Sequence, residues 1–345
     1  MTNTQPERDT LSLCMIVRDE AYFLTRCLEA VRDHVDEIVI VDTGSKDDTI
    51  SIANRFTTRV CRFDWCDDFA AARNYSLEQA TGDWVLVLDA DEILLPDDFE
   101  QIYKAMRDAP SDVYFLQQLN YSNEPMEPGW QRLAKEHPLG WPYQGYVRNP
   151  IARLFRRRED IRYVGKVHEV VDEDIPGVRY DKVDIVIHHD YDGNPHKSRN
   201  NRQKGYLDIM EHALKEGANG RLASYAGRVR MYHMQDYSGA IERFRQAIAL
   251  DHNPDENLSS MAEAYYRLND FESARNLYAK LYQRGFRQLA SCNNYANLLV
   301  KAKDYKTAVE VLETTLKLPQ ITADWEQTIR KNINYLKKKV SSHAG

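Results

Sequence analysis

The chain has 345 residues, enough for about two domains of ordinary size. It carries 46 Lys and Arg against 53 Asp and Glu, a formal net charge of -7, so its overall charge does not indicate nucleic acid or an anionic membrane as the main partner. The first ten residues lack the basic and apolar segments of a signal peptide, and no later apolar run reaches the roughly 20 residues of a membrane span. We therefore expect a cytoplasmic protein whose five cysteines are free thiols.

Residues 1–10 are expected to be a flexible N-terminus, and residues 11–195 alternate short apolar runs with helical stretches. This pattern is typical of a mostly parallel sheet wrapped by helices. The predicted strands are Leu11–Val17, Glu37–Val41, Thr58–Phe63, Trp84–Leu88 and Val113–Gln117. The predicted helices are Ala21–Arg32, Lys46–Phe56, Asp68–Ala80 and Pro96–Asp108. Ligands of such sheets bind beyond the carboxyl ends of the strands, where Asp42 and Asp89 stand.

The second half of the chain repeats itself. Asp236-Tyr-Ser-Gly-Ala240, Asp270-Phe-Glu-Ser-Ala274 and Asp304-Tyr-Lys-Thr-Ala308 follow one another at 34 positions, the period of tetratricopeptide helix pairs. Such repeats need stacking neighbours, so Arg199–Glu216 is predicted as a leading helix and Trp325–Lys338 as a capping helix. We expect a connecting helix over residues 196–220 and an all-α repeat domain over residues 221–340.

Two aspartates, Asp89 and Asp91, follow the apolar run that begins at Trp84. Residues i and i+2 of a strand point the same way, so this spacing lets both carboxylates grip one divalent cation. Hard cations with oxygen ligands neutralise the charge of nucleotide diphosphates. Asp-x-Asp also occurs in turns and helix caps, so the pair alone leaves both interpretations open.

Asp42 ends a second apolar strand and precedes a glycine turn and a helix start rich in Ser and Asp. A carboxylate there can accept a hydrogen bond from a nucleobase N–H, and the turn lets a flat base approach the backbone. Alternatively, Asp42 and Ser45 cap the following helix. The acidic pair at another strand end favours the binding interpretation.

Four blocks occur in an order that resembles the donor half of glycosyltransferase family 2. They are Met15-Ile-Val-Arg-Asp-Glu20, Val41-Asp-Thr-Gly-Ser45, Ala72-Arg-Asn74 and Thr81-Gly-Asp-Trp-Val-Leu-Val-Leu-Asp-Ala-Asp-Glu92. The resemblance implies an α/β, Rossmann-like GT-A domain, which the all-α tetratricopeptide-repeat domain follows. The family usually has a second acidic residue where this chain has Thr43, which leaves base recognition to Asp42.

The same resemblance implies roles for single residues. Asp42 would contact uracil of a UDP-sugar, and Glu20 the nucleoside region. Arg73 would contact the donor phosphates or the nearby acid cluster. Asp89 and Asp91 would hold Mg2+ or Mn2+ against the diphosphate, with Asp91 the more direct ligand.

Later blocks extend the resemblance to one part of the family. Arg153-Leu-Phe-Arg156, Gly165-Lys-Val-His168-Glu169 and Ile185-Val-Ile-His188-His-Asp-Tyr191 are similar in order to lipopolysaccharide-core transferases and to tetratricopeptide-bearing transferases that glycosylate bacteriocin peptides or flagellins. Inverting transfer needs a base for the acceptor's proton, and we assign this role to Glu169. Either an aspartate of the Asp89–Glu92 cluster is the base instead, or Glu169 pairs with an arginine of the run Arg156–Arg158 and only shapes the site.

His188 follows the apolar run Val183–Ile187, where a strand would deliver it as a third metal ligand, with His189 facing the opposite side. The alternative is a structural histidine. Lys197 or Arg199 either closes over the departing diphosphate or starts the connecting helix. Two stretches rich in Pro, Gly and aromatic residues, 121–130 and 138–146, are either substrate-selecting loops or packed surface loops.

The sequence therefore predicts a metal-dependent inverting transferase that moves a hexosyl or N-acetylhexosaminyl group from a UDP-sugar to a peptide or protein, on Ser/Thr hydroxyl or Cys thiol. The repeats would present the acceptor or join two copies into a homodimer. One alternative is a transferase for lipopolysaccharide core or another cell-envelope glycan. Another is a tetratricopeptide adaptor with an inactive nucleotide-sugar domain. The sequence has no dinucleotide-binding or P-loop phosphate motif.

Overall fold

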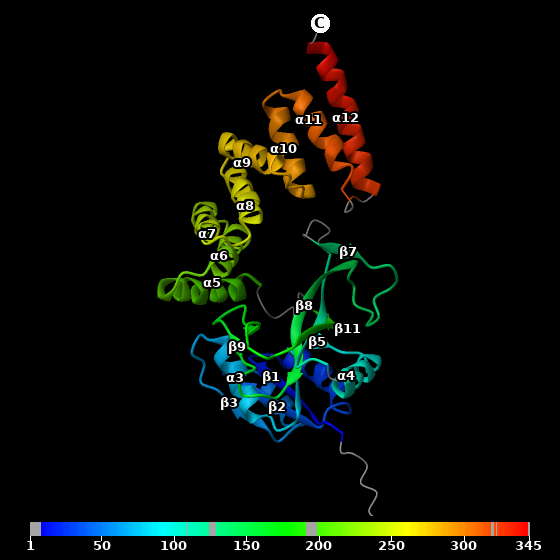
Figure 1. Ribbon diagram of the computed structural model, residues 1–345, viewed down its shortest axis with the longest axis vertical. Coiled ribbons are helices and arrows are strands. Elements are labelled where there is room, and N and C mark those ends of the chain that lie inside the picture. The colour runs from blue at the N-terminus through cyan, green and yellow to red at the C-terminus, as the bar shows by residue number, and fades with distance from the viewer. Residues whose placement is uncertain are drawn as a thin grey trace, which may run out of the picture. The chain divides into compact units, whose positions relative to one another are not determined.

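The computed structural model describes residues 8–108, 110–123, 129–190, 199–318, 321 and 323–343. The chain divides into two compact units, Met1–Arg199 and Asn200–Gly345. Figure 1 shows the first unit as a twisted sheet with helices and the second as an array of helices. Within the described ranges, no helix is both long and apolar enough to cross a membrane.

The first unit is built on a nine-stranded mixed sheet, counted over the described residues, with strand order β3-β2-β1-β4-β8-β6-β11-β5 and with β7 paired to β8. Its strands are β1 Leu11–Val17, β2 Glu37–Asp42, β3 Val60–Arg62, β4 Trp84–Val87, β5 Glu92–Ile93, β6 Val113–Ser122, β7 Trp130–Arg132, β8 Gly145–Arg156 and β11 Tyr180–His189; β9 Tyr163–Val164 and β10 Val170–Val171 form a separate pair. Strands β3, β2, β1 and β4 are parallel. The expected parallel sheet is therefore confirmed in this half, whereas β8 runs antiparallel to both β4 and β6.

Helices cover both faces of the parallel strands because those strands are apolar on both sides. The helices are α1 Ala21–Val31, α2 Thr49–Ala53, α3 Phe69–Gln79 and α4 Pro96–Asp108. Leu13 and Met15 of β1 pack in one core with α1 and α4, and Cys14 packs in a second core with α3. The alternation of side chains along β1 thus fixes which face each helix covers.

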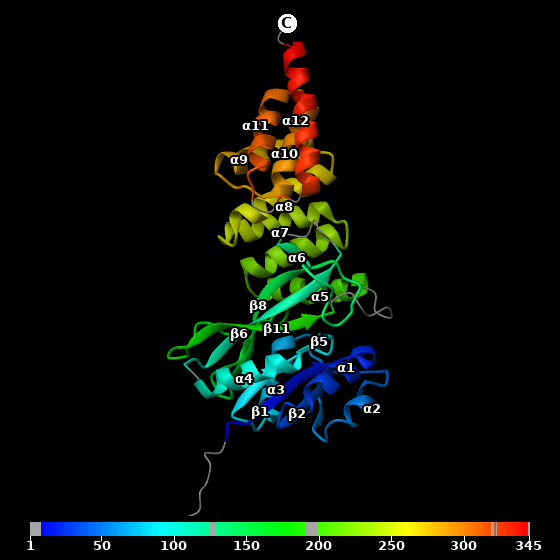
Figure 2. The same cartoon turned by 90° about the vertical axis from the view of Figure 1, so that its right-hand side faces the viewer.

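The second unit confirms the repeat interpretation. Its helices are α5 Arg199–Glu216, α6 Gly220–Tyr232, α7 Tyr237–Ala249, α8 Pro254–Arg267, α9 Phe271–Gln283, α10 Leu289–Lys301, α11 Tyr305–Thr315 and α12 Ala323–His343, and Figure 2 shows successive helices packed side by side. The alanines that recur every 34 positions, Ala240, Ala274 and Ala308, are fully buried. The predicted leading and capping helices are α5 and α12.

Each repeat starts its second helix in the same way. Asp236, Asp270 and Asp304 accept hydrogen bonds from the backbone N–H groups of Gly239, Ser273 and Thr307, three residues on. The residue before each aspartate, in turn Gln235, Asn269 and Lys303, has a positive φ, which reverses the chain between the helices. The recurring aspartate is thus a helix cap, and this explains its regular spacing along the chain.

Gly227 provides a test of repeat packing. A Cβ atom at this position of α6 would lie 2.6 Å from a ring carbon of the buried Phe244 on α7. Gly227→Ala should therefore destabilise the helical unit by about 1–3 kcal/mol, although alanine favours helix formation. Urea unfolding followed by circular dichroism measures the change. Gly205→Ala in α5 is the matched control, because its Cβ meets nothing within 4 Å; equal effects at the two positions would contradict the packing described.

Candidate active site

The carboxyl ends of β1, β2 and β4 meet at one edge of the sheet because these strands are adjacent and parallel. Glu20 follows β1, Asp42 ends β2 and Asp89 follows β4. The backbone N–H of Glu20 donates to Thr49 Oγ1 at 2.7 Å, which ties the loop after β1 to the start of α2. The structure therefore brings the first three predicted site residues to the same edge.

Asp42 organises the turn that follows it. Its carboxylate accepts hydrogen bonds from the N–H groups of Gly44 at 3.0 Å and Ser45 at 3.2 Å, and Gly44 has a φ of 109° that only glycine adopts readily. Ser45 Oγ in turn accepts from the N–H of Asp19. Helix α2 begins only at Thr49, whose backbone N–H donates a hydrogen bond to Asp47 Oδ1. Asp42 thus caps its own turn, and the alternative that it caps the helix does not hold.

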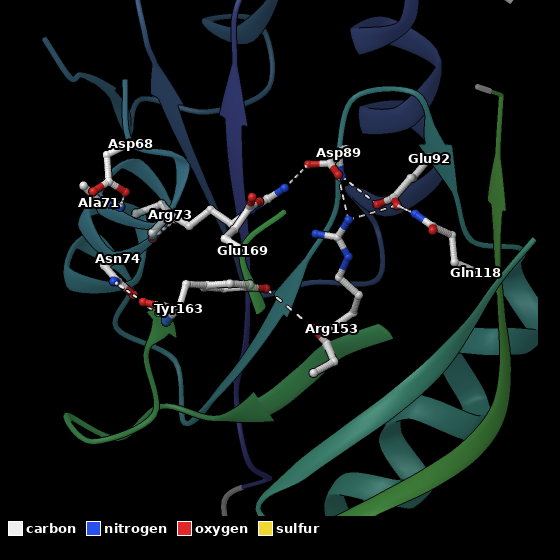
Figure 3. A network of polar contacts seen from close by, with 12 residues as sticks. Asp68, Ala71, Arg73, Asn74, Asp89, Glu92, Gln118, Arg153, Tyr163 and Glu169 are labelled. Atoms are coloured by element: carbon white, nitrogen blue, oxygen red, sulfur yellow. Dashed lines mark hydrogen bonds and ion pairs between the residues drawn. The ribbon is translucent and has the colours of Figure 1, made fainter. Parts of the chain in front are cut away.

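The centre of the site is Asp89, which two arginines hold from separate elements (Figure 3). Arg73 Nη2, from α3, lies 2.9 Å from Asp89 Oδ1, and Arg153 Nη2, from β8, lies 2.6 Å from Asp89 Oδ2. The arginine side chains are only 8% and 3% exposed, whereas that of Asp89 is 31% exposed. Both oxygens of Asp89 therefore face guanidinium groups at the rim of the core.

Glu92 anchors the inner side of this network. Its side chain is fully buried and accepts hydrogen bonds from Arg153 at 3.0 Å, from Gln118 Nε2 at 2.5 Å and from the backbone N–H of Asp89 at 2.8 Å. The last contact closes the loop between β4 and β5, so that the loop's two aspartates are held in place. Buried charges persist only when they are paired and hydrogen-bonded in this way.

The network shifts the pKa values of its members in opposite directions. Desolvation acts to raise the pKa of Asp89, but Arg153 and Arg73 outweigh it and hold the pKa well below its usual range. Burial raises the pKa of Glu92; Arg153 opposes this shift and the neighbouring Asp89 adds to it. Asp89 is therefore the firmly ionised member of the pair and is a poor general base. This geometry disfavours Asp89 as the alternative base.

Glu169 reaches the same centre from the β9–β10 pair. Its Oε1 lies 2.5 Å from Arg73 Nε, and its side chain is 11% exposed. The side chain of Asn74, next to Arg73 on α3, exchanges two hydrogen bonds of 2.9 and 2.8 Å with the backbone of Tyr163 on β9. This clamp holds the β9–β10 pair against α3. The alternative pairing of Glu169 with the run Arg156–Arg158 does not occur; its partner is Arg73.

The two histidines of β11 lie the other way round from the sequence expectation. His189 Nε2 lies 3.4 Å from Asp91 Oδ2, and His189 Nδ1 lies 2.5 Å from Asn120 Oδ1. His188 Nδ1 instead bonds the hydroxyl of Tyr121 at 2.8 Å, on the opposite side of the strand. The prediction that His188 faces the metal-binding aspartates and His189 the opposite side is therefore wrong. The two-residue strand β5, which begins with Glu92, pairs with β11 in a register that sets Glu92 opposite His189.

Burial acts to lower the pKa of His189, but Asp91, Glu92 and Asp89 outweigh it and raise the pKa. With Asn120 Oδ1 as acceptor, Nδ1 carries a proton, so Nε2 faces Asp91 either with a second proton or with a lone pair. A cation held beside His189 and Asp91 would relieve the repulsion between that lone pair and the carboxylate. By contrast, burial and His137 lower the pKa of His188 to about 4, so His188 is a neutral, packed side chain.

The aromatic stretch before β8 is a packed loop. The ring of Trp141 stacks on His137, with ring centroids 4.8 Å apart, and the guanidinium of Arg26 lies 4.7 Å from the Trp141 ring centre. Asp190 fastens the loop, because it accepts from Tyr143 Oη at 2.7 Å and pairs with Arg26 at 3.0 Å. Trp141 is therefore engaged by other side chains of the unit, and the packed-loop interpretation holds for this part of the stretch.

The donor set fits a metal ion that is shared with a phosphate. Asp91 is 15% exposed and stands beside the partly exposed Asp89. Over the part of the chain that the structure describes, no three His, Cys, Asp or Glu side chains are arranged to enclose a metal by themselves. Mg2+ is usually bound through one or two carboxylates together with water and substrate phosphates. The residues thus suit a cation held against a diphosphate, and not a closed structural metal site.

Sequence reasoning missed several residues of this site. Arg153, Gln118 and Asn120 received no role, although Arg153 stands in a block that carries the resemblance. A buried arginine on a strand is a signal, since charge in an apolar strand needs a partner. Lys197 and the side chain of Arg199 lie outside the described residues, so their roles stay predictions.

Comparison with known proteins identifies the class of the first unit. The family model described as Glycosyl transferase family 2 matches residues 12–165. Residues 12–165 thus match the glycosyltransferase family 2 model, and helical repeats of the tetratricopeptide type follow them in the chain.

Individual relatives match slightly less than half of the chain. A TPR repeat-containing protein of Synechococcus elongatus is 42% identical over 166 residues, which cover 48% of this chain and 36% of that protein. The SPbeta prophage-derived glycosyltransferase SunS of Bacillus subtilis is 28% identical over 162 residues, which cover 46% of this chain and 34% of that protein. The match thus spans about a third of each relative. A crystal structure of S. aureus TarS 1-349 overlaps 80% of this chain and 92% of that chain at 13% identity, with a TM-score of 0.41.

The central ion-pair network yields a stability prediction. Arg153→Met would leave Glu92 and Asp89 without one of their cationic partners inside the unit, which should cost about 3–5 kcal/mol. Urea unfolding followed by tryptophan fluorescence measures the loss. Arg62→Met is the control, because Arg62 and its partner Asp64 are 82% and 90% exposed and should contribute little. A loss at Arg153 no larger than at Arg62 would contradict the network's role in stability.

Proposed function

We propose that this protein is a metal-dependent inverting glycosyltransferase that transfers a sugar from a UDP-sugar to a peptide or protein side chain. The observation that carries the proposal is the placement of Asp91 beside Asp89 and His189, at the sheet edge that also holds Asp42. Among the described residues there, and with His189 counted as neutral, four carboxyl groups, of Asp89, Asp91, Glu92 and Glu169, meet the two guanidinium groups of Arg73 and Arg153. The formal excess of two negative charges suits a divalent cation.

Asp91 would be the main protein ligand of Mg2+ or Mn2+, with Asp89 beside it. The bound cation would neutralise charge on the diphosphate as it leaves. In this proposal His189, and not His188, is the histidine beside the metal ligands. Two arginines already engage Asp89. Its carboxylate would therefore mainly hold the loop in place and would contribute less than Asp91 to metal coordination.

Donor recognition would begin at Asp42 and Glu20. Asp42 holds its turn through its carboxylate and would also accept the uracil N–H, while Glu20 would contact the nucleoside region. Arg73 would contact both the acid cluster and the phosphates of the donor. It pairs with Asp89 and Glu169, and its Nη1 is a buried donor with no hydrogen-bond partner among the described residues, which leaves the two N–H groups of Nη1 for oxygens of the donor substrate.

Glu169 would take the proton of the acceptor hydroxyl or thiol while that atom attacks the anomeric carbon and UDP departs from the opposite face. Its contact with Arg73 uses Oε1, and in the described part of the chain no hydrogen bond to Oε2 is formed. The ion pair would therefore orient the carboxylate and leave one oxygen for the acceptor.

A peptide or protein acceptor is favoured because helical repeats form extended surfaces that suit chains. The relative in Synechococcus elongatus is also called a TPR repeat-containing protein, and the relative in Bacillus subtilis a glycosyltransferase. The donor sugar is tested first, by measuring UDP release from a panel of UDP-sugars with Mn2+. Mass spectrometry of peptide mixtures incubated with the active donor then tests the acceptor. Extension of a lipid-linked glycan with no peptide shift would overturn the peptide assignment.

Asp91→Asn tests the metal role. The change preserves shape and removes the charge, so UDP-sugar turnover should fall by at least about 100-fold while the unfolding curve stays unchanged. Asp97→Asn, an exposed aspartate in the first turn of α4, is the control and should keep full activity. Wild-type turnover by Asp91→Asn at limiting Mn2+ would exclude Asp91 as a metal ligand.

Glu169→Gln tests the base. The amide cannot accept a proton, so transfer should fall about 10²–10⁴-fold while UDP binds with Mn2+ as in the wild type. Single-turnover transfer and calorimetric UDP binding separate the two effects. Near-normal transfer would move the base to another group; loss of UDP binding as well would mean that Glu169 serves mainly to hold Arg73.

A further inference from the structure

The two units carry opposite net charges. Residues 1–199 contain 24 Lys and Arg against 37 Asp and Glu, a formal charge of -13. Residues 200–345 contain 22 Lys and Arg against 16 Asp and Glu, a formal charge of +6. The whole-chain value of -7 hides this asymmetry. An acidic chain is repelled by the first unit and attracted by the second, because like charges repel and opposite charges steer encounter.

Part of the positive charge lies in a band across the first helices of consecutive repeats. The band consists of Tyr225, Arg228 and Tyr232 on α6, Glu263, Tyr266 and Arg267 on α8, and Lys301 on α10. Contacts join its members from helix to helix: Tyr232 Oη donates to Glu263 at 3.1 Å, and Lys301 Nζ lies 5.1 Å from the ring centre of Tyr266. The band is therefore one continuous surface of the helical unit.

Two cations of this band have no carboxylate partner in the described part of the chain. Arg228 lies over the ring of Tyr225, 5.2 Å from its centre, and Lys301 lies over Phe271 at 3.8 Å. Both side chains are exposed, and neither forms an ion pair with another described residue. Arg267 pairs with Glu263 at 3.2 Å, yet its own side chain stays 54% exposed. Other arginines of the same unit are neutralised, as Arg230 and Arg243 are by Glu211.

We propose that this band binds an acidic stretch of the polypeptide that the enzyme modifies; the acceptor part of this statement rests on the proposed function. Carboxylates of such a stretch pair with Arg228, Arg267 and Lys301. Tyr232, which is 55% exposed, supplies a flat surface for the chain between the acidic residues. Cations already stacked on aromatic rings are held in place before binding, so less side-chain entropy is lost.

The spacing of the cations argues for an extended chain. Arg228, Arg267 and Lys301 stand on three successive first helices, α6, α8 and α10, rather than around one point. A single small anion would engage one of them, whereas an extended acidic segment can engage all three. The substrate class is therefore an acceptor polypeptide that carries an extended acidic segment.

Binding to the full-length protein tests this proposal without any sugar transfer. The probe is a fluorescein-labelled peptide of repeated Glu-Ser-Gly, with peptides of repeated Gln-Ser-Gly and Lys-Ser-Gly as matched probes, measured by anisotropy in EDTA and without UDP-sugar. The acidic peptide should bind about tenfold or more tightly than the neutral one, and its affinity should fall as NaCl is raised. Absence of binding by the acidic peptide, or tighter binding of the basic one, would overturn the proposal.

A charge-matched pair of variants locates the binding surface. Arg228→Glu with Lys301→Glu should weaken acidic-peptide binding about tenfold or more, and Arg228→Gln with Lys301→Gln should weaken it less. Lys280→Glu with Lys306→Glu alters two exposed lysines on α9 and α11 by the same charge and should change binding about twofold or less. Equal losses in the two Glu pairs would show attraction by net charge alone and would overturn the band as the site.

Two further measurements distinguish a peptide-binding surface from a subunit interface and from a part of the donor site. Analytical ultracentrifugation of the Arg228→Glu, Lys301→Glu protein should match the wild type; a change of oligomeric state would make the band a subunit interface and overturn the proposal. UDP release from the donor should be unchanged in this protein, because the band lies outside residues 1–199. Peptide binding by an inactive enzyme would leave the band supported and the proposed function refuted, so the two failures are distinguishable.

Discussion

The site depends on one interaction, the ion pairs that hold Asp89 between Arg73 and Arg153. These arginines come from α3 and β8, and Asp89 comes from the loop after β4, so a helix, a strand and a loop meet at one carboxylate. Buried guanidinium groups are costly unless each finds an anion. The fold meets that requirement only when the antiparallel strand β8 lies beside β4. The charge network therefore constrains the sheet topology as much as the chemistry.

Other parts of the site follow from this constraint. Arg73 also holds Glu169, and Asn74 beside it clamps the β9–β10 pair, so the proposed base is positioned by the helix that fixes Asp89. Glu92 accepts the backbone N–H of Asp89 and so closes the loop between β4 and β5. Glu92 is also the first residue of β5, which pairs with β11, the strand that carries His189. Asp91 stands between these fixed points with its carboxylate near the surface. A rigid surround with partly exposed carboxylates, at Asp89 and Asp91, is an arrangement that suits a metal bound together with a substrate phosphate.

Local patterns predicted the first half of the sheet and the repeats well. The apolar run of β1 and the 34-residue period of the aspartate caps each depend on contacts within a short window, which the sequence displays directly. The orientation of His188 and His189 was not predictable in this way, because it is set by the pairing of the two-residue strand β5 with β11. Likewise, the partner of Glu169 depends on the position of the β9–β10 pair against α3. Such register choices are made by tertiary contacts that leave no local pattern.

The central claim is that this network presents Asp91 to a cation that a nucleotide diphosphate shares. Isothermal titration calorimetry of UDP into the full-length protein, with Mn2+ and with EDTA, tests it most directly. We expect UDP binding that is at least about tenfold tighter with Mn2+, because a cation held by Asp91 would neutralise charge on the diphosphate. UDP affinity that is the same in Mn2+ and in EDTA, or no UDP binding in either, would contradict the account.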